Sequence, residues 1–160
     1  MNIIKNRSEL ATTPQRDRAL DLVEAGIRSV LPDRVMRSAL RYDSKRHVLT
    51  VNRAAYDLSK GRLFVVGGGK AGALMAEALE RIVPPDRITD GVVNCRHGSS
   101  ETKKIDVVVA GSPLPDERGV DGVRRMLDLK QKYSIGSDDV VLCLISGGGS
   151  ALLPAPAGDI

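Results

Sequence analysis

Residues 63–82 read LFVVGGGKAGALMAEALERI. They open on four apolar residues, pass through three glycines and a lysine, and continue with apolar residues three and four positions apart. The apolar run predicts a buried strand, the glycines predict a tight turn, and the later spacing predicts an amphipathic helix. The segment is therefore a strand–loop–helix unit of the kind from which parallel sheets are built.

The same alternation continues toward the carboxyl end. Strands are predicted over 91–95, 105–110 and 139–146, and a helix over 116–133 with Val120, Val123 and Leu127 facing inward. Continuously apolar strands that alternate with amphipathic helices are typical of a sheet buried on both faces. We expect an α/β fold, a doubly wound parallel sheet with helices on both faces, over residues 61–160.

Residues 1–60 differ, because they hold only one of the 16 glycines. We expect a helical segment with one short strand, over 47–51, that packs on the core. Thr13 and Pro14 are a typical helix start, and Pro32 ends that helix. Its apolar face is expected to hold Leu20, Val23, Ile27 and Val30, and a second short helix is predicted over 33–41.

Composition places the chain among soluble globular proteins. It has 160 residues, of which 42% are hydrophobic and 28% charged, a length for one domain. No apolar run approaches the ~18 residues of a membrane span, and the first residues lack the apolar centre of a signal peptide. We therefore expect no membrane partner and a cytoplasmic location. Cys95 and Cys143 lie in apolar runs and are expected to be reduced core residues.

The net charge of +4 is confined to the N-terminal third. Residues 1–60 hold 12 Lys and Arg against 7 Asp and Glu, whereas residues 61–160 hold 12 against 13. Arg34, Arg37 and Arg41 have helical spacing and predict a basic stripe. Nucleic-acid surfaces usually add aromatic side chains, and this chain has one Phe, three Tyr and no Trp. We expect no nucleic-acid partner and a stripe that faces solvent or another protein.

The first of three candidate loops, GGGKAG at 67–72, follows the strand over 63–66. Ligands of parallel sheets bind beyond the carboxyl ends of the strands. Gly67, Gly68 and Gly69 allow backbone N–H groups to approach an anion, and Lys70 adds a full positive charge. The alternative is a tight turn with an exposed lysine.

The same loop fits G-x-G-x-x-G, the dinucleotide pattern. That pattern expects an acidic residue at the end of the next strand, where this chain has Asn94, Cys95 and Arg96. Arg96 could meet the 2′-phosphate of NADP. A Walker A loop is excluded, because Phe64 stands where its first glycine should be and Ala71 replaces its Ser or Thr.

Two further loops lie at the same edge. GSPLPDERG at 111–119 offers Ser112 and Asp116, and Asp116 either caps the next helix or meets substrate or metal. ISGGGSAL at 145–152 repeats the logic of the first loop, since hydroxyls flank three glycines. Two such loops on one sheet indicate a site for two anionic groups, as in phosphoryl transfer. The residues expected to bind phosphate in the last loop are Ser146, Gly147, Gly148, Gly149 and Ser150.

Other chemistries have weaker support. His97 follows the strand over 91–95 and is either a site residue or a loop histidine. No Cys/His spacing for zinc and no G-x-S-x-G motif is present.

Three segments together resemble a known family. VVGGGKAGALMAEALE (65–80), AGSPLPDERG (110–119) and DDVVLCLISGGGSALLPAPAG (138–158), in this order, resemble the glycerate 2-kinase family of the MOFRL type. Some members of that family are labelled hydroxypyruvate reductase. The resemblance runs from about Thr13 to the last residue. It implies a Rossmann-like N-terminal domain, and phosphorylation of D-glycerate to 2-phosphoglycerate with ATP and a divalent metal such as Mg²⁺.

The resemblance also assigns roles to residues. It places the family's catalytic lysine on Lys70 and its nucleotide- or phosphate-binding segment on 146–150. The family's G-H-P-x-P-D segment falls on 111–116, where Ser112 replaces the usual histidine and puts any proton transfer by that histidine in doubt. The hydroxyl proton is expected to go to a base outside this chain or to Asp116.

Family members are more than twice as long. The sequence therefore predicts a partial N-terminal domain, with the MOFRL domain absent, that is inactive alone. Two alternatives stay open: an NADP-dependent hydroxypyruvate reductase, and a non-catalytic domain that binds a phosphorylated metabolite. An uncovered sheet edge would also favour a homo-oligomer.

Overall fold

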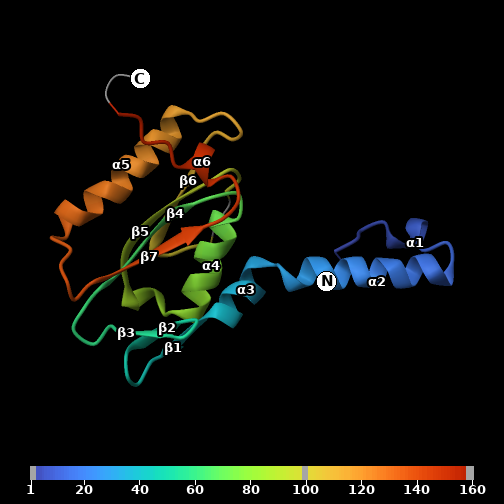
Figure 1. The fold of residues 1–160 in the computed structure, drawn as a ribbon, viewed down its shortest axis with the longest axis horizontal. Coiled ribbons are helices and arrows are strands. Elements are labelled where there is room, and N and C mark those ends of the chain that lie inside the picture. Colours follow the sequence, from blue (N-terminus) through green and yellow to red (C-terminus); the bar gives the residue numbers. More distant parts are fainter. Residues whose placement is uncertain (1–2, 99–100, 158–160) are drawn as a thin grey trace.

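A computed structural model describes residues 3–98 and 101–157 and shows a parallel sheet between helices, with a smaller antiparallel sheet at one end (Figure 1). The helices and strands, in chain order, are α1 (Arg7–Leu10), α2 (Pro14–Ser29), α3 (Pro32–Ala39), β1 (Leu40–Asp43), β2 (Val48–Val51), β3 (Ala54–Asp57), β4 (Leu63–Gly68), α4 (Gly72–Ile82), η1 (Pro85–Arg87), β5 (Ile88–Cys95), β6 (Ile105–Val109), α5 (Glu117–Lys132), β7 (Val140–Ile145) and α6 (Gly149–Leu152).

The main sheet has the strand order β6-β5-β4-β7, and every pair is parallel. The chain moves outward from β4 through β5 to β6 and then returns to the other side of β4 as β7. The order therefore reverses between β4 and β7, which is where doubly wound folds bind their ligands. This topology confirms the predicted α/β class and places both glycine loops at the reversal.

The two crossover helices cover opposite faces of the sheet. Leu63 and Val65 of β4 pack in one fully buried cluster with Ala76 and Leu79 of α4. The intervening residue Phe64 faces α5 instead. Successive side chains of a strand point to opposite faces, so helices lie on both faces, as predicted.

The face under α5 is covered only in part. Phe64 and Val66 line an apolar cavity of about 430 Å³ with residues of α5 and β7. Leu127 lines this cavity and so lies on the predicted side of α5, but it is 67% exposed, and Leu129 is the buried residue of that turn. Helical spacing identifies an apolar face, but the cover on that face depends on the neighbouring elements.

The two cysteines also differ from each other in burial. Cys95 is buried, as predicted, whereas Cys143 is exposed, so the prediction of a core residue fails there. Cys143 lies on β7, on the face where the apolar cavity lies. Its apolar run does form a strand, but β7 is the edge of the described sheet and has a neighbour on one side only.

A three-stranded antiparallel sheet, β1-β2-β3, precedes the main sheet. The predicted strand over 47–51 is its middle strand, β2. Two residues, Asn52 and Arg53, connect β2 to β3, and Asn52 has a left-handed φ of 54°. Leu49, Leu58 and Met36 of α3 are buried in the same cluster as Leu63. The later part of the N-terminal segment therefore packs on the core.

Helix α2 projects away from the sheets (Figure 1). The Thr13 hydroxyl accepts a hydrogen bond from the Arg16 N–H at 3.2 Å, which confirms the predicted cap. The main contacts of α2 are with α1 and α3, and Val23 and Val30 on its apolar face are exposed. The segment 1–60 was expected to pack on the core, and the described contacts show this for its later part but not for α2.

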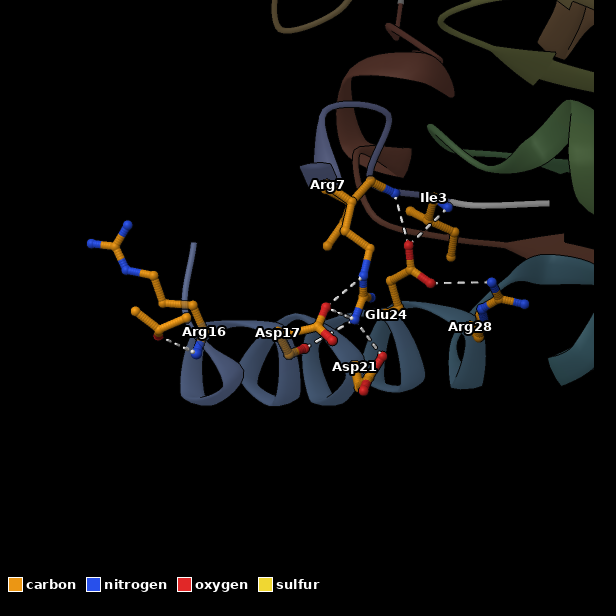
Figure 2. Close-up of polar contacts among 9 residues, drawn as sticks. Ile3, Arg7, Arg16, Asp17, Asp21, Glu24 and Arg28 are labelled. Atoms are coloured by element: carbon orange, nitrogen blue, oxygen red, sulfur yellow. Dashed lines mark hydrogen bonds and ion pairs between the residues drawn. The ribbon is translucent and has the colours of Figure 1, made fainter. Parts of the chain in front are cut away.

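The residues before α2 fold back along it (Figure 2). Glu24 is buried, and one carboxylate oxygen accepts from the N–H groups of Ile3 and Ile4 at 3.1 and 3.0 Å. Arg7 pairs with Asp17 and Asp21 at 2.6 Å each. These bonds use the polar side of α2 and leave its apolar side open.

The basic stripe is not helical along its whole length. Helix α3 ends at Ala39, so Arg41 lies on β1, and Arg37 pairs with Asp33 at 3.0 Å. The prediction of one helical stripe is therefore wrong. Within residues 3–98 and 101–157, no helix is both long enough and apolar enough to cross a bilayer.

Candidate phosphate-binding site

The first glycine loop lies very close to β7 and the loop that follows it. A Cβ at Gly67 would lie 2.1 Å from the carbonyl oxygen of Leu144, and a Cβ at Gly69 would lie 2.1 Å from Oγ of Ser146. Both glycines also have positive φ values, 152° and 143°. Only glycine meets both demands, so these residues allow the close approach of the two loops.

Three hydrogen bonds join the two loops. The Lys70 N–H donates to the Gly147 carbonyl at 2.9 Å, and the Ser146 N–H donates to the Gly68 carbonyl at 3.2 Å. The Ala71 N–H donates to Oγ of Ser146 at 3.1 Å. The two motifs that were predicted separately therefore form one structural unit between β4 and β7.

This bonding changes the role of the first loop. The N–H groups of Gly69, Lys70, Ala71 and Gly72 all have acceptors within the protein. Gly67 and Gly68 belong to β4, which is paired on both sides. The prediction that Gly67, Gly68 and Gly69 offer N–H groups to a phosphate is not supported, because these glycines serve close packing instead.

The second loop keeps its donors. Among the described residues, the N–H groups of Gly147, Gly148, Gly149 and Ser150 have no hydrogen-bond acceptor. Gly148 adopts a left-handed conformation with φ of 90°. Consecutive N–H groups without acceptors, in a turn that contains such a residue, are typical of anion-binding backbone.

Lys70 brings positive charge to these donors. A Cβ at Gly148 would lie 3.2 Å from Cγ and 3.3 Å from Cε of Lys70, so the lysine side chain runs along the second loop. Lys70 is exposed, and it forms no ion pair with the part of the chain that the structure describes. An unpaired ammonium beside free N–H groups favours an anion at this point.

Asp116 is occupied by structural bonds. One oxygen accepts from the Gly119 N–H at 3.1 Å and caps α5, as one of the two predictions had it. The other oxygen pairs with Arg118 at 2.7 Å. The Gly111 N–H and the Arg118 guanidinium lower the pKa of this carboxyl below its ordinary value, so it is a weak proton acceptor. The described contacts support the role of Asp116 as a helix cap, and none of them supports its predicted role as a base.

Ser112 and His97 stand farther along the same edge. Ser112 follows β6, two strands from β4, and His97 follows β5 and is exposed. The carbonyl of His97 accepts a hydrogen bond from Sγ of Cys95 at 3.1 Å. No contact among the described residues joins either side chain to Lys70 or to the second glycine loop, so their predicted roles in substrate binding remain predictions.

Asn94 is a site residue whose role was not predicted. Its side chain is fully buried beneath the loops, and it donates to the carbonyls of Gly119 and Leu152. The sequence signal that could have identified it is its position as a polar residue at the end of β5, directly after apolar residues. Because its side chain is fully buried against α5, Asn94 cannot take the ribose as the acidic residue of the dinucleotide pattern does.

The described residues offer no complete set of metal ligands. In the ranges 3–98 and 101–157, no three His, Cys, Asp or Glu side chains gather where they could hold an ion. The donor set therefore does not fit a divalent metal held by these residues alone.

Comparison with known proteins identifies relatives. A family model described as "Domain of unknown function (DUF4147)" matches residues 18–160. Glycerate 2-kinase of Pyrococcus horikoshii is 34% identical over 142 residues, which are 88% of this chain and 30% of that protein. A protein of Agrobacterium vitis whose name refers to hydroxypyruvate reductase is 40% identical over 100 residues, 62% of this chain and 22% of that protein.

Solved structures agree with the fold. A crystal structure of a Pyrococcus horikoshii OT3 protein matches 93% of this chain and 33% of its own with a TM-score of 0.77 and 33% identity. The crystal structure of glycerate kinase from Thermotoga maritima matches 89% of this chain and 30% of its own, with a TM-score of 0.66 and 30% identity. This chain spans about 30% of the length of the glycerate kinases that it matches. It belongs to the DUF4147 family and is a homologue of the glycerate 2-kinases.

Proposed function

We propose that this chain contributes the phosphate-binding part of an ATP-dependent glycerate 2-kinase. The reaction would transfer the γ-phosphoryl group of ATP to the 2-hydroxyl of D-glycerate, giving 2-phosphoglycerate and ADP and releasing the hydroxyl proton. The observation that carries the proposal is the position of Lys70 along a loop whose N–H groups are free. The naming of the relatives as glycerate kinases supports the substrate class.

The two parts of this site suit different tasks in phosphoryl transfer. The N–H groups of Gly147–Ser150 would hold phosphate oxygens by short hydrogen bonds. Lys70 would neutralise the negative charge that spreads over the transferred group. In phosphoryl transfer the protein mainly positions the reactants and stabilises charge in this way.

The remaining parts of the reaction are assigned elsewhere. Mg²⁺ bound to the nucleotide phosphates would reduce their charge, but the described residues supply no ligand set for it. The capping bonds of Asp116 make it a poor acceptor for the hydroxyl proton. We propose that the general base lies outside the described residues.

A calorimetric titration tests the proposal. Wild-type chain, Lys70→Ala and Lys60→Ala are each titrated with Mg-ATP, and in parallel with NADPH, with and without D-glycerate. Lys60 is the matched control, because it is an exposed lysine that precedes β4, at the other end of the strand. A unit charge about 4 Å from another contributes about 1–4 kcal/mol near a protein surface, so Lys70→Ala is expected to weaken Mg-ATP binding roughly fivefold or more.

Two results would contradict the proposal. Heat with NADPH but not with Mg-ATP would favour the reductase. Equal loss of Mg-ATP binding in Lys60→Ala and Lys70→Ala would show that only net charge matters, and not the position of Lys70.

A further inference from the structure

Asn94 is a buried polar side chain near the carboxyl end of β5, after the apolar residues Val92 and Val93. It is 0% exposed, and its neighbours Val92, Val93 and Cys95 are buried as well. A buried amide is costly unless its polar atoms find partners. Its hydrogen bonds therefore show what it does in the fold.

Those bonds connect three separate elements. The Asn94 side-chain nitrogen donates to the carbonyl of Gly119 in the first turn of α5 at 2.9 Å. It also donates to the carbonyl of Leu152, the last residue of α6, at 2.7 Å. The backbone carbonyl of Asn94 accepts from the Gly69 N–H at 3.1 Å. One residue thus holds the first glycine loop, α5 and the segment after the second glycine loop.

Helix α5 is shaped to receive this side chain. A Cβ at Gly122 would lie 1.9 Å from Oδ1 of Asn94, so the amide lies directly against the helix backbone. Glycine inside a helix is unfavourable compared with alanine, and this contact explains its presence at Gly122.

The other end of the amide has no partner. Oδ1 of Asn94 is buried and accepts no hydrogen bond within the described residues. An apolar side chain of similar size would fill the same space without that cost. The two donated bonds, and not packing, therefore account for an asparagine at this position.

We propose that Asn94 is a positioning residue that fixes the second glycine loop relative to the first, so that its free N–H groups and the Lys70 ammonium face the same phosphate. This inference rests on the proposed function, since it concerns the same site. It assigns the position of the loop to a residue that does not itself touch the ligand.

Two substitutions at this position and one control test the proposal. Asn94→Leu removes both donors at similar volume, and Asn94→Asp preserves the shape while replacing the N–H donors with a carboxyl oxygen. Ile88→Ala is the control, because Ile88 is buried at the opposite end of the same strand. Hydrogen exchange is measured across 146–153, the unfolding midpoint is measured in urea, and Mg-ATP affinity is measured by calorimetry.

Loss of two hydrogen bonds is expected to raise exchange at the hydrogen-bonded amides of this segment, those of Ser146, Leu152 and Leu153, by about tenfold or more. Mg-ATP affinity is expected to fall by about tenfold in at least one Asn94 variant that folds. It is expected to fall little in Ile88→Ala, even if the urea midpoint of Ile88→Ala is as low as that of the Asn94 variants. Equal exchange across 146–153 in the control and in the Asn94 variants would overturn the proposal. Affinity that follows the unfolding midpoint in all variants would overturn it too. Absence of Mg-ATP binding in the wild type would instead count against the proposed function, and the exchange measurement would still decide the role of Asn94 in the loop.

Discussion

Gly69→Ala should separate the two glycine loops. A Cβ at this residue would lie 2.1 Å from Oγ and 2.6 Å from the carbonyl oxygen of Ser146, and ordinary contacts begin at 3.4 Å. The Ser146 hydroxyl must therefore rotate away, and the backbone of the second loop must move by about 0.8 Å, the difference between 3.4 and 2.6 Å. That movement is expected to break the hydrogen bond from the Ala71 N–H to Ser146.

The cost follows from two contributions. A non-glycine residue at the φ of 143° that Gly69 adopts costs about 1–3 kcal/mol. Loss of the hydrogen bond adds about 1 kcal/mol. We expect the free energy of unfolding to fall by about 2–4 kcal/mol, which a domain of typical stability survives.

The assay compares Gly69→Ala with Gly136→Ala. Gly136 is exposed and precedes β7, at the end of that strand away from the loops; a Cβ there would meet no atom within 4 Å, and its φ is not positive. Its substitution should change the free energy of unfolding by less than about 0.5 kcal/mol. Urea unfolding followed by circular dichroism gives both values, and calorimetry gives the Mg-ATP affinity, which should weaken in Gly69→Ala. Equal stability and equal affinity in the two variants would refute this loop geometry.

Two further predictions concern titration and thiol reactivity. The Arg62 guanidinium, 2.7 Å from Asp139, and backbone N–H groups hold the pKa of the Asp139 carboxyl far below its ordinary value. A carboxyl with a lowered pKa stabilises the fold above its unfolded pKa near 4, and this stabilisation is lost as the pH falls below that value. Asp139→Asn should lower the urea midpoint at pH 7 and flatten its decline between about pH 4 and 2, and an unchanged pH profile would contradict the pairing. The Cys143 thiol is exposed, whereas the Cys95 thiol is buried and burial raises its pKa. Ellman's reagent should therefore modify Cys143 quickly in the folded protein and Cys95 only after unfolding. Two thiols that react quickly in the folded protein would count against the described fold.

The main sheet could be predicted because its signals are local. Each buried strand is an apolar run, and each connecting helix has its own apolar spacing. Sequence alone identifies Thr13 and Asp116 as caps, and both form the cap hydrogen bond. Glycine runs after β4 and β7 mark the two loops that the structure joins.

Two of the three strands of the antiparallel sheet, β1 and β3, were missed for physical reasons. Strands β1 and β3 have four residues each, and every residue of β3 is exposed. Because β3 has no buried face, it lacks the apolar alternation that identifies a strand. Strand β1 does alternate, with Leu40 buried, but it is short and its first two residues fall within the helix predicted over 33–41. Asn52, which adopts a left-handed conformation at the turn, is a hairpin signal that could have identified them.

Within the site, sequence identified the two glycine loops but not which of them has free N–H groups. Three glycines in a row predict free N–H groups equally well at 67–69 and at 147–149. Which set is free depends on the hydrogen bonds between the loops, and those bonds join residues about 75 positions apart, as between Ala71 and Ser146. The burial of Asn94 depends on the same long-range packing.

A titration of the ¹⁵N-labelled chain with Mg-ATP, followed by backbone amide chemical shifts, tests whether the two loops form one anion site. We expect the amides of Gly147–Ser150 and of Lys70 to shift together with one dissociation constant, and that constant to rise roughly fivefold or more in Lys70→Ala. Shifts confined to the first loop, or centred on Arg34 and Arg37 of α3, would contradict a phosphate site between β4 and β7.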